Sequence, residues 1–234
     1  MSANSFLAKF LRFVGIVLMG LTAGFTLLGG AGTSCVALNP TGFGENMAPL
    51  APFQWLYILF VLTGVALGIL GIRATVMLIK GRDKSYRDAM VVLIAGVVIG
   101  AIHVAVSQAL RGKSMPVDGV VYTTVITLAI FLLFRIPTIW QGVNFTKGNR
   151  NDSNLAGGAA AIVFGFMTLT IQFSMGPTHT WNGVNYADAF NVMMSLVGVG
   201  SLLAGGSQIL SALSHRRRMQ SQSPALSSRE TLSQ

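Results

Sequence analysis

His103 is the side chain of this sequence best placed for chemistry, because it is the only ionisable residue well inside one of the long apolar stretches. An ionisable group at such a position is costly to keep in lipid, so its presence suggests a functional site. Gly96, Gly100, His103 and Ser107 follow at spacings of four, three and four residues, so they form one stripe along a helix. Small residues let helices approach closely, and we therefore expect His103 to be buried between helices.

The last apolar stretch carries a second polar stripe at helical spacing. Its members are Asp188, Asn191, Ser195, Gly198 and Gly205. With a rise of about 1.5 Å per residue, His103 and Ser195 each lie on the order of 10 Å from the same end of their helices, and so does Thr127 in the fourth stretch. These positions together predict a polar layer at one level of the helix bundle.

Two interpretations of this layer remain open. In the first, it forms an outward-open pocket for a polar or amphipathic ligand, with His103 as its proton-sensitive group. Asn191 and Thr127 then orient the ligand, and Asp188 lies at the mouth. The candidate ligand-binding residues are His103, Ser107, Thr127, Asn191, Ser195 and Asp188. In the second, Ser and Thr bond their own helix backbones, while His103 and Asn191 cross-link helices at about 0.6 kcal/mol per bond.

Known enzyme chemistries find little support in these residues. The sequence holds no HExxH motif, and the apolar stretches contain no carboxylate except Asp188, so a catalytic metal centre lacks ligands. Cys35 is the single cysteine, which excludes a dithiol enzyme. Ser107 lies one turn from His103 without a Gly-x-Ser-x-Gly context, and haem ligation by His103 and His179 is equally unspecific. We expect no cofactor and no metal, and an enzyme ranks last among the functions considered.

The elements that position these residues follow from composition. Of the 234 residues, 52% are hydrophobic and 10% charged, with a mean hydropathy of +0.64, against about 25% charged residues in soluble domains. Six apolar stretches are long enough to cross a hydrocarbon core as helices, since an unpaired backbone group in lipid costs several kcal/mol. They run at about 10–30, 53–79, 89–110, 120–140, 155–175 and 187–213. The sequence therefore predicts an all-α, six-span transmembrane bundle over residues 1–218.

Basic residues set the expected orientation. The net charge is +9, but the Lys and Arg form short clusters between apolar stretches rather than a surface stripe, so no nucleic acid is expected as a partner. All of them except Arg111 and Lys113 fall on one side of the predicted spans. The positive-inside rule places both termini in the cytoplasm of a multi-pass cell-membrane protein. We expect the cytoplasmic run 80–88 to contact anionic lipid headgroups, and Tyr57 and Tyr122 to mark outer interfaces.

The two ends of the chain carry separate expectations. The first stretch has an alternative as a signal sequence with lipidation at Cys35, although Gly32 stands where a lipoprotein signal has a leucine-like residue. Residues 219–234 are dominated by Ser and Gln, which predicts a disordered cytoplasmic tail.

Glycine is the most informative residue for packing. The chain has 27 glycines, and several recur every four residues inside the stretches, a spacing that lets helix backbones approach. These pairs are Gly20 and Gly24, Gly64 and Gly68, and Gly96 and Gly100. We expect them to pack helices within one chain, the alternative being a homo-oligomer or a larger membrane complex.

The leading functional expectation is a non-enzymatic bundle, either a structural or accessory protein or one that holds a lipid-like ligand. The alternative is a small-solute transporter or channel that uses the outer polar layer around His103. A transport path needs polar positions through the inner half as well. The sequence supplies chiefly Ser201, Ser207 and Gln208 there, which favours the first expectation.

Overall fold

The computed structural model describes residues 2–176, 179–181 and 183–230, with only the backbone for residues 181 and 219–230. Helices account for nearly all of it, as the composition predicts. The only strands among these residues are β1 (Thr180–Trp181) and β2 (Val184–Asn185), which pair antiparallel with Thr180 opposite Asn185.

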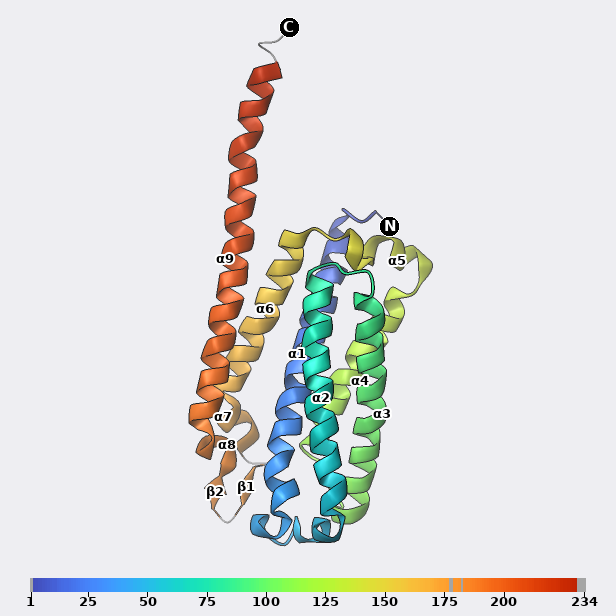
Figure 1. Cartoon of the computed structure of the whole chain (residues 1–234), viewed down its shortest axis with the longest axis vertical. Coiled ribbons are helices and arrows are strands. Elements are labelled where there is room, and N and C mark those ends of the chain that lie inside the picture. The colour runs from blue at the N-terminus through green and yellow to red at the C-terminus, as the bar shows by residue number, and fades with distance from the viewer. Residues whose placement is uncertain (1, 177–178, 182, 231–234) are drawn as a thin grey trace.

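The first four long helices form an up-and-down bundle (Figure 1). They are α1 (Phe6–Leu38), α2 (Gln54–Ile79), α3 (Ser85–Arg111) and α4 (Val117–Phe134), and α1 connects to α2 through the short 3₁₀ helices η1 (Pro40–Phe43) and η2 (Ala48–Phe53). Each helix packs on the next along the chain, and α4 packs back on α1. Short connections make such neighbours antiparallel.

The remaining helices add a cap and a hairpin. At one end of the bundle lie α5 (Pro137–Val143) and η3 (Phe145–Lys147). The chain then forms α6 (Arg150–Leu169), α7 (Ile171–Met175), α8 (Tyr186–Ala189) and α9 (Asn191–Glu230). Helix α9 packs chiefly on α6, and α6 packs on α1 and α2 (Figure 1).

Five helical segments have the length and apolar composition to cross a membrane. They are Phe6–Leu38, Ala48–Ile79, Ser85–Arg111, Val117–Phe134 and Asn191–Arg218. The predicted stretch 155–175 is not among them: it is divided at Thr170 between α6 and α7, and the first turn of α6 is polar. The composition therefore supports a membrane protein, and the structure supplies five apolar helices for it.

Several predicted boundaries differ from the structure, among them the end of the first stretch, since α1 continues to Leu38 instead of stopping near residue 30. The predicted end of the stretch 120–140 is wrong, because α4 stops at Phe134 and a new helix begins at Pro137. A proline disfavours helical backbone at the residue before it, and Ile136 has a ψ of 124°. Helix α1 begins four residues early, at Phe6, where Ser5 caps its first turn. The α9 backbone continues to Glu230, beyond the predicted end of the last stretch at residue 213 and into the predicted tail 219–234, of which residues 231–234 lie outside the described residues. Each added residue extends an existing helix at little cost.

The glycine pairs pack helices within this chain, as their spacing predicts. Gly20 and Gly24 face α6, Gly64 and Gly68 face α1, and Gly96 and Gly100 face α4. The closest backbone approach joins α1 to α2, where a Cβ on Gly68 would lie 2.6 Å from Leu27 Cα and a Cβ on Gly30 would lie 2.8 Å from the Val65 nitrogen. At such positions only glycine lets the two backbones stay in contact.

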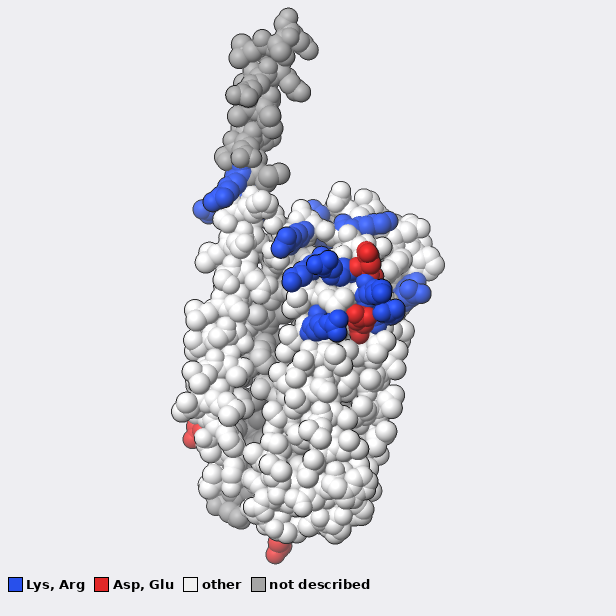
Figure 2. Space-filling model, viewed as in Figure 1, with Lys and Arg blue, Asp and Glu red and all other residues white. Residues whose placement is uncertain are grey.

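Figure 2 shows that Lys and Arg gather at one end of the molecule, the end that holds α5 and the α2–α3 connection. The long surface below that end carries almost no charge in this view. Large apolar side chains such as Leu62, Ile69 and Leu203 are more than half exposed along the helices. An apolar belt below a basic rim is the surface expected of a chain in lipid.

Candidate functional site

His103 is buried, as the stripe on α3 predicts, but its partners come from α2. Its ring is 8% exposed and stacks on Phe60 with centroids 4.3 Å apart, while Tyr57 meets it edge to face at 5.3 Å. Gly96 and Gly100 of the same stripe face α4 instead. The stripe is thus shared between two neighbours, because α3 packs on both α2 and α4.

Tyr57 is buried, whereas the sequence predicts an interfacial ring at this end of its helix. It is 2% exposed, and its hydroxyl lies 2.7 Å from Ser107 Oγ. A buried tyrosine hydroxyl needs such a partner. The signal was available: Tyr57 and Phe60 are three residues apart on α2, so they share a face.

The end of the same cluster that is farther from the basic rim contains unpaired polar atoms. Arg111 follows Ser107 by one turn of α3, and Asp118 begins α4 across the loop. Arg111 Nε and Asp118 Oδ1 are buried without a hydrogen-bond partner among the described residues. The other carboxylate oxygen of Asp118 accepts a hydrogen bond from Ser114 Oγ at 3.0 Å. Polar atoms of this kind call for a water or a ligand.

The other predicted site residues lie in different contacts. Thr127 Oγ1 is 2.8 Å from the Thr123 carbonyl and 2.8 Å from Thr22 Oγ1, so it joins α4 to α1. Ser195 donates to Asn191 Oδ1 within α9 at 3.2 Å, and Asp188 is exposed on α8. The structure brings His103 and Ser107 together and gives Thr127, Asn191, Ser195 and Asp188 other neighbours.

Most hydroxyls in the bundle satisfy their own helix. Thr26, Thr63 and Thr75 each donate to the carbonyl four residues earlier, at 2.7 to 2.9 Å. Thr168 and Ser201 do the same in α6 and α9. Hydroxyls bonded in this way offer few free groups to a passing solute.

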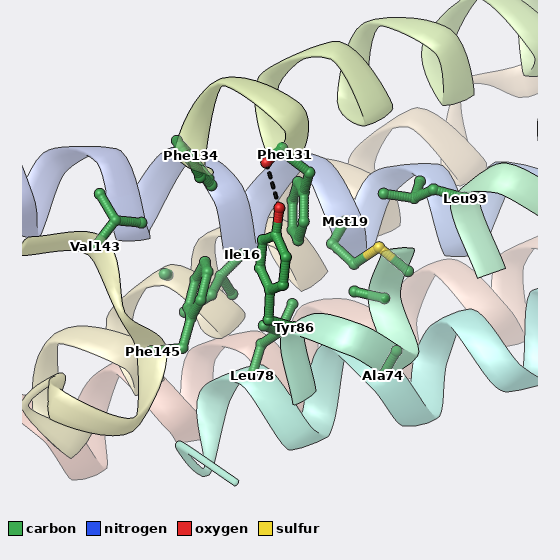
Figure 3. Packing of buried hydrophobic residues seen from close by; sticks show 12 residues of the cluster. Ile16, Met19, Ala74, Leu78, Tyr86, Leu93, Phe131, Phe134, Val143 and Phe145 are labelled. Carbon is green, nitrogen blue, oxygen red and sulfur yellow. Dashed lines mark hydrogen bonds between the residues drawn. The ribbon is translucent and has the colours of Figure 1, made fainter. Parts of the chain in front are cut away.

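At the basic end, aromatic side chains fill the bundle (Figure 3). Tyr86 of α3 donates to the Phe131 carbonyl at 2.5 Å, and its ring stacks on Phe131. Phe134 of α4 and Phe145 of η3 complete the cluster, both with 2% exposure. The chain after α4 therefore turns back onto the bundle. Its helices α5 and η3, residues 137–147, form a plug that closes this end of the four helices.

Arg12 holds the plug and was missed as a buried residue. It is 4% exposed; its Nη1 donates to the Gly142 carbonyl at 2.8 Å, and its Nη2 to the Ala3 carbonyl at 2.7 Å. The sequence shows Arg12 only as one of the basic residues at the cytoplasmic start of the first apolar stretch, with no sign of its burial. The early start of α1 instead puts it inside the bundle end.

Comparison with known proteins adds no match: no protein-family model, curated protein or solved structure matches this chain. In the part of the chain that the structure describes, no three His, Cys, Asp or Glu side chains are grouped to hold a metal ion.

Proposed function

We propose that this chain is a six-span membrane protein with a structural or accessory role and no solute path of its own. The observation that carries the proposal is the filled interior of the four-helix bundle. Aromatic rings occupy its basic end, the Thr22–Thr127 bond joins α1 and α4 in the middle, and His103 packs between rings near the other end. A channel or transporter needs polar groups that continue through the protein.

The membrane placement rests on the apolar belt and the basic rim. In this proposal α6, with 20 residues, is a sixth crossing in addition to the five apolar helices. Its packing on α1 and α9 supports this placement (Figure 1). With the basic rim on the cytoplasmic side, both termini are cytoplasmic. Lipid covers the belt, and anionic headgroups contact the rim.

A second candidate, a transporter or ligand-binding protein, is favoured by one observation. The unpaired Arg111 Nε and Asp118 Oδ1 lie at the outer end of the polar cluster that contains Tyr57, Ser107 and His103. A small polar solute that replaced a water there would have both donors and acceptors. In that function His103 is the essential group.

A flux measurement separates the two functions. Protein in liposomes is tested for proton entry with an internal pH dye and for glycerol entry by stopped-flow light scattering. The structural role predicts rates equal to those of protein-free liposomes for both the natural chain and the His103→Leu variant. Entry faster by tenfold or more that His103→Leu abolishes would contradict the structural role and establish the second candidate.

A further inference from the structure

A surface pocket of about 570 Å³ lies at the basic end, where α2 meets the loop to α3. Its wall carries Arg73, Val76, Met77, Lys80, Arg82 and Lys84. The first four are spaced by three, one and three residues along α2 and its C-cap Lys80, so they lie on one helix face. Arg73 is about 10 Å from Lys80 along the helix axis. The pocket thus joins an apolar strip to cations at two depths.

Backbone hydrogen bonds fix the conformation of the loop that carries Arg82 and Lys84. Gly81 has a positive φ of 61°, the Arg82 amide donates to the Met77 carbonyl at 3.0 Å, and the Gly81 amide donates to the Leu78 carbonyl at 3.1 Å. This is the Schellman ending of a helix. A Cβ on Gly81 would also lie 3.0 Å from the Phe145 carbonyl oxygen, so the turn rests against the plug. The cations are held on a rigid support.

The pocket cations have no partners in the part of the chain that the structure describes. Within the described residues, the ion pairs of the chain use Lys9, Arg87 and Arg216, and none of the four pocket cations forms a side-chain hydrogen bond or ion pair. Asp83 supplies the one carboxylate of the wall, so cations outnumber it four to one. Unpaired cations beside apolar side chains favour an anionic amphiphile.

The other basic pocket is a weaker candidate. It lies between α6 and α9 with a volume of about 780 Å³, and its wall consists of polar and charged residues without an apolar side chain. Its Arg216 already donates to Asp152. That pocket lacks the apolar strip that an acyl chain would cover.

We propose that the α2–α3 pocket binds one anionic phospholipid of the inner leaflet. The cations hold the phosphate, and an acyl chain lies along Val76 towards Ile72 and Ile69, which are exposed on α2. A free phosphate ion would use the cations but leave the apolar strip uncovered, so the lipid is the better match. The assignment rests on the proposed cytoplasmic placement of the basic end for its leaflet.

The test is native mass spectrometry of the full chain in detergent with phosphatidylglycerol, phosphatidylcholine or inorganic phosphate added. We expect one phosphatidylglycerol to be retained in preference to phosphatidylcholine. Arg73→Gln with Lys80→Gln should weaken its retention on the order of tenfold. The matched control, Arg87→Gln with Lys147→Gln, removes the same charge from the same end outside the pocket and should stay within about twofold.

The outcomes separate this site from the proposed function. Equal weakening in both variants, or none in either, would overturn the site while leaving the membrane placement intact. Saturation by inorganic phosphate without a preference for the lipid would overturn the lipid as occupant. The binding is measured in detergent, so an error in orientation does not affect it and would appear only in a topology measurement.

Discussion

Gly205→Leu is expected to separate α9 from α6 and to destabilise the protein by about 3 kcal/mol. A Cβ at this position would lie 2.7 Å from the Gly158 carbonyl oxygen and 3.0 Å from the Ile162 nitrogen. Both are backbone atoms, so the helices themselves must move. The contact is reciprocal, since a Cβ on Gly158 would lie 2.8 Å from the Gly205 carbonyl oxygen.

The control for this variant is its neighbour in the sequence. Gly206 lies on the same helix, and a Cβ there would meet nothing within 4 Å. Gly206→Leu therefore adds the same side chain without the collision. By scanning fluorimetry in detergent, we expect the melting temperature to fall by about 6 to 12 °C for Gly205→Leu and by no more than about 2 °C for Gly206→Leu. Equal melting temperatures would disprove the close packing of α6 on α9.

Arg12→Met is expected to release the plug at the basic end. Methionine keeps the length of the side chain but removes the donors to the Gly142 and Ala3 carbonyls. Hydrogen bonds from a charged group contribute about 1.5–3 kcal/mol each, so a loss of about 3 kcal/mol follows. Hydrogen exchange should accelerate at the amides of 137–147 more than in α2 or α3.

Lys9→Met is the matched control for Arg12. Lys9 lies on the same helix, its side chain is 46% exposed, and its contact with Asp152 is 3.9 Å long. Exposed pairs of this kind contribute about 0–1 kcal/mol. Similar exchange in the two variants would show that Arg12 does not anchor α5 and η3.

Periodicity predicted the faces of the helices but not their neighbours. The α3 stripe correctly predicted a buried His103, because a polar group beside small residues avoids lipid. The spacing of a stripe does not predict which helix packs against it. In the structure one part of the α3 stripe contacts α2 and the other part contacts α4. The ring partners Tyr57 and Phe60 were therefore missed, although they lie at the matching depth of α2.

Hydropathy predicts the apolar helices correctly, but it does not predict the turn after α4 that brings the chain back onto the bundle. The segment after Phe134 is apolar enough to read as more of the fourth span, yet Pro137 starts a new helix that closes the basic end. The burial of Arg12 depends on this return of the chain. Tertiary contacts of that kind leave no local signal in a single sequence.

Cysteine labelling in whole cells tests the membrane topology, the central claim, most directly. Single cysteines replace Thr41, Lys84, Lys147 and Val184, all exposed, in a Cys35→Ser background. A membrane-impermeant maleimide should label Thr41→Cys and Val184→Cys from outside, and Lys84→Cys and Lys147→Cys only after permeabilisation. Labelling of Lys147→Cys and Val184→Cys from the same side would show that α6 does not cross, and external labelling of Lys84→Cys would reverse the orientation.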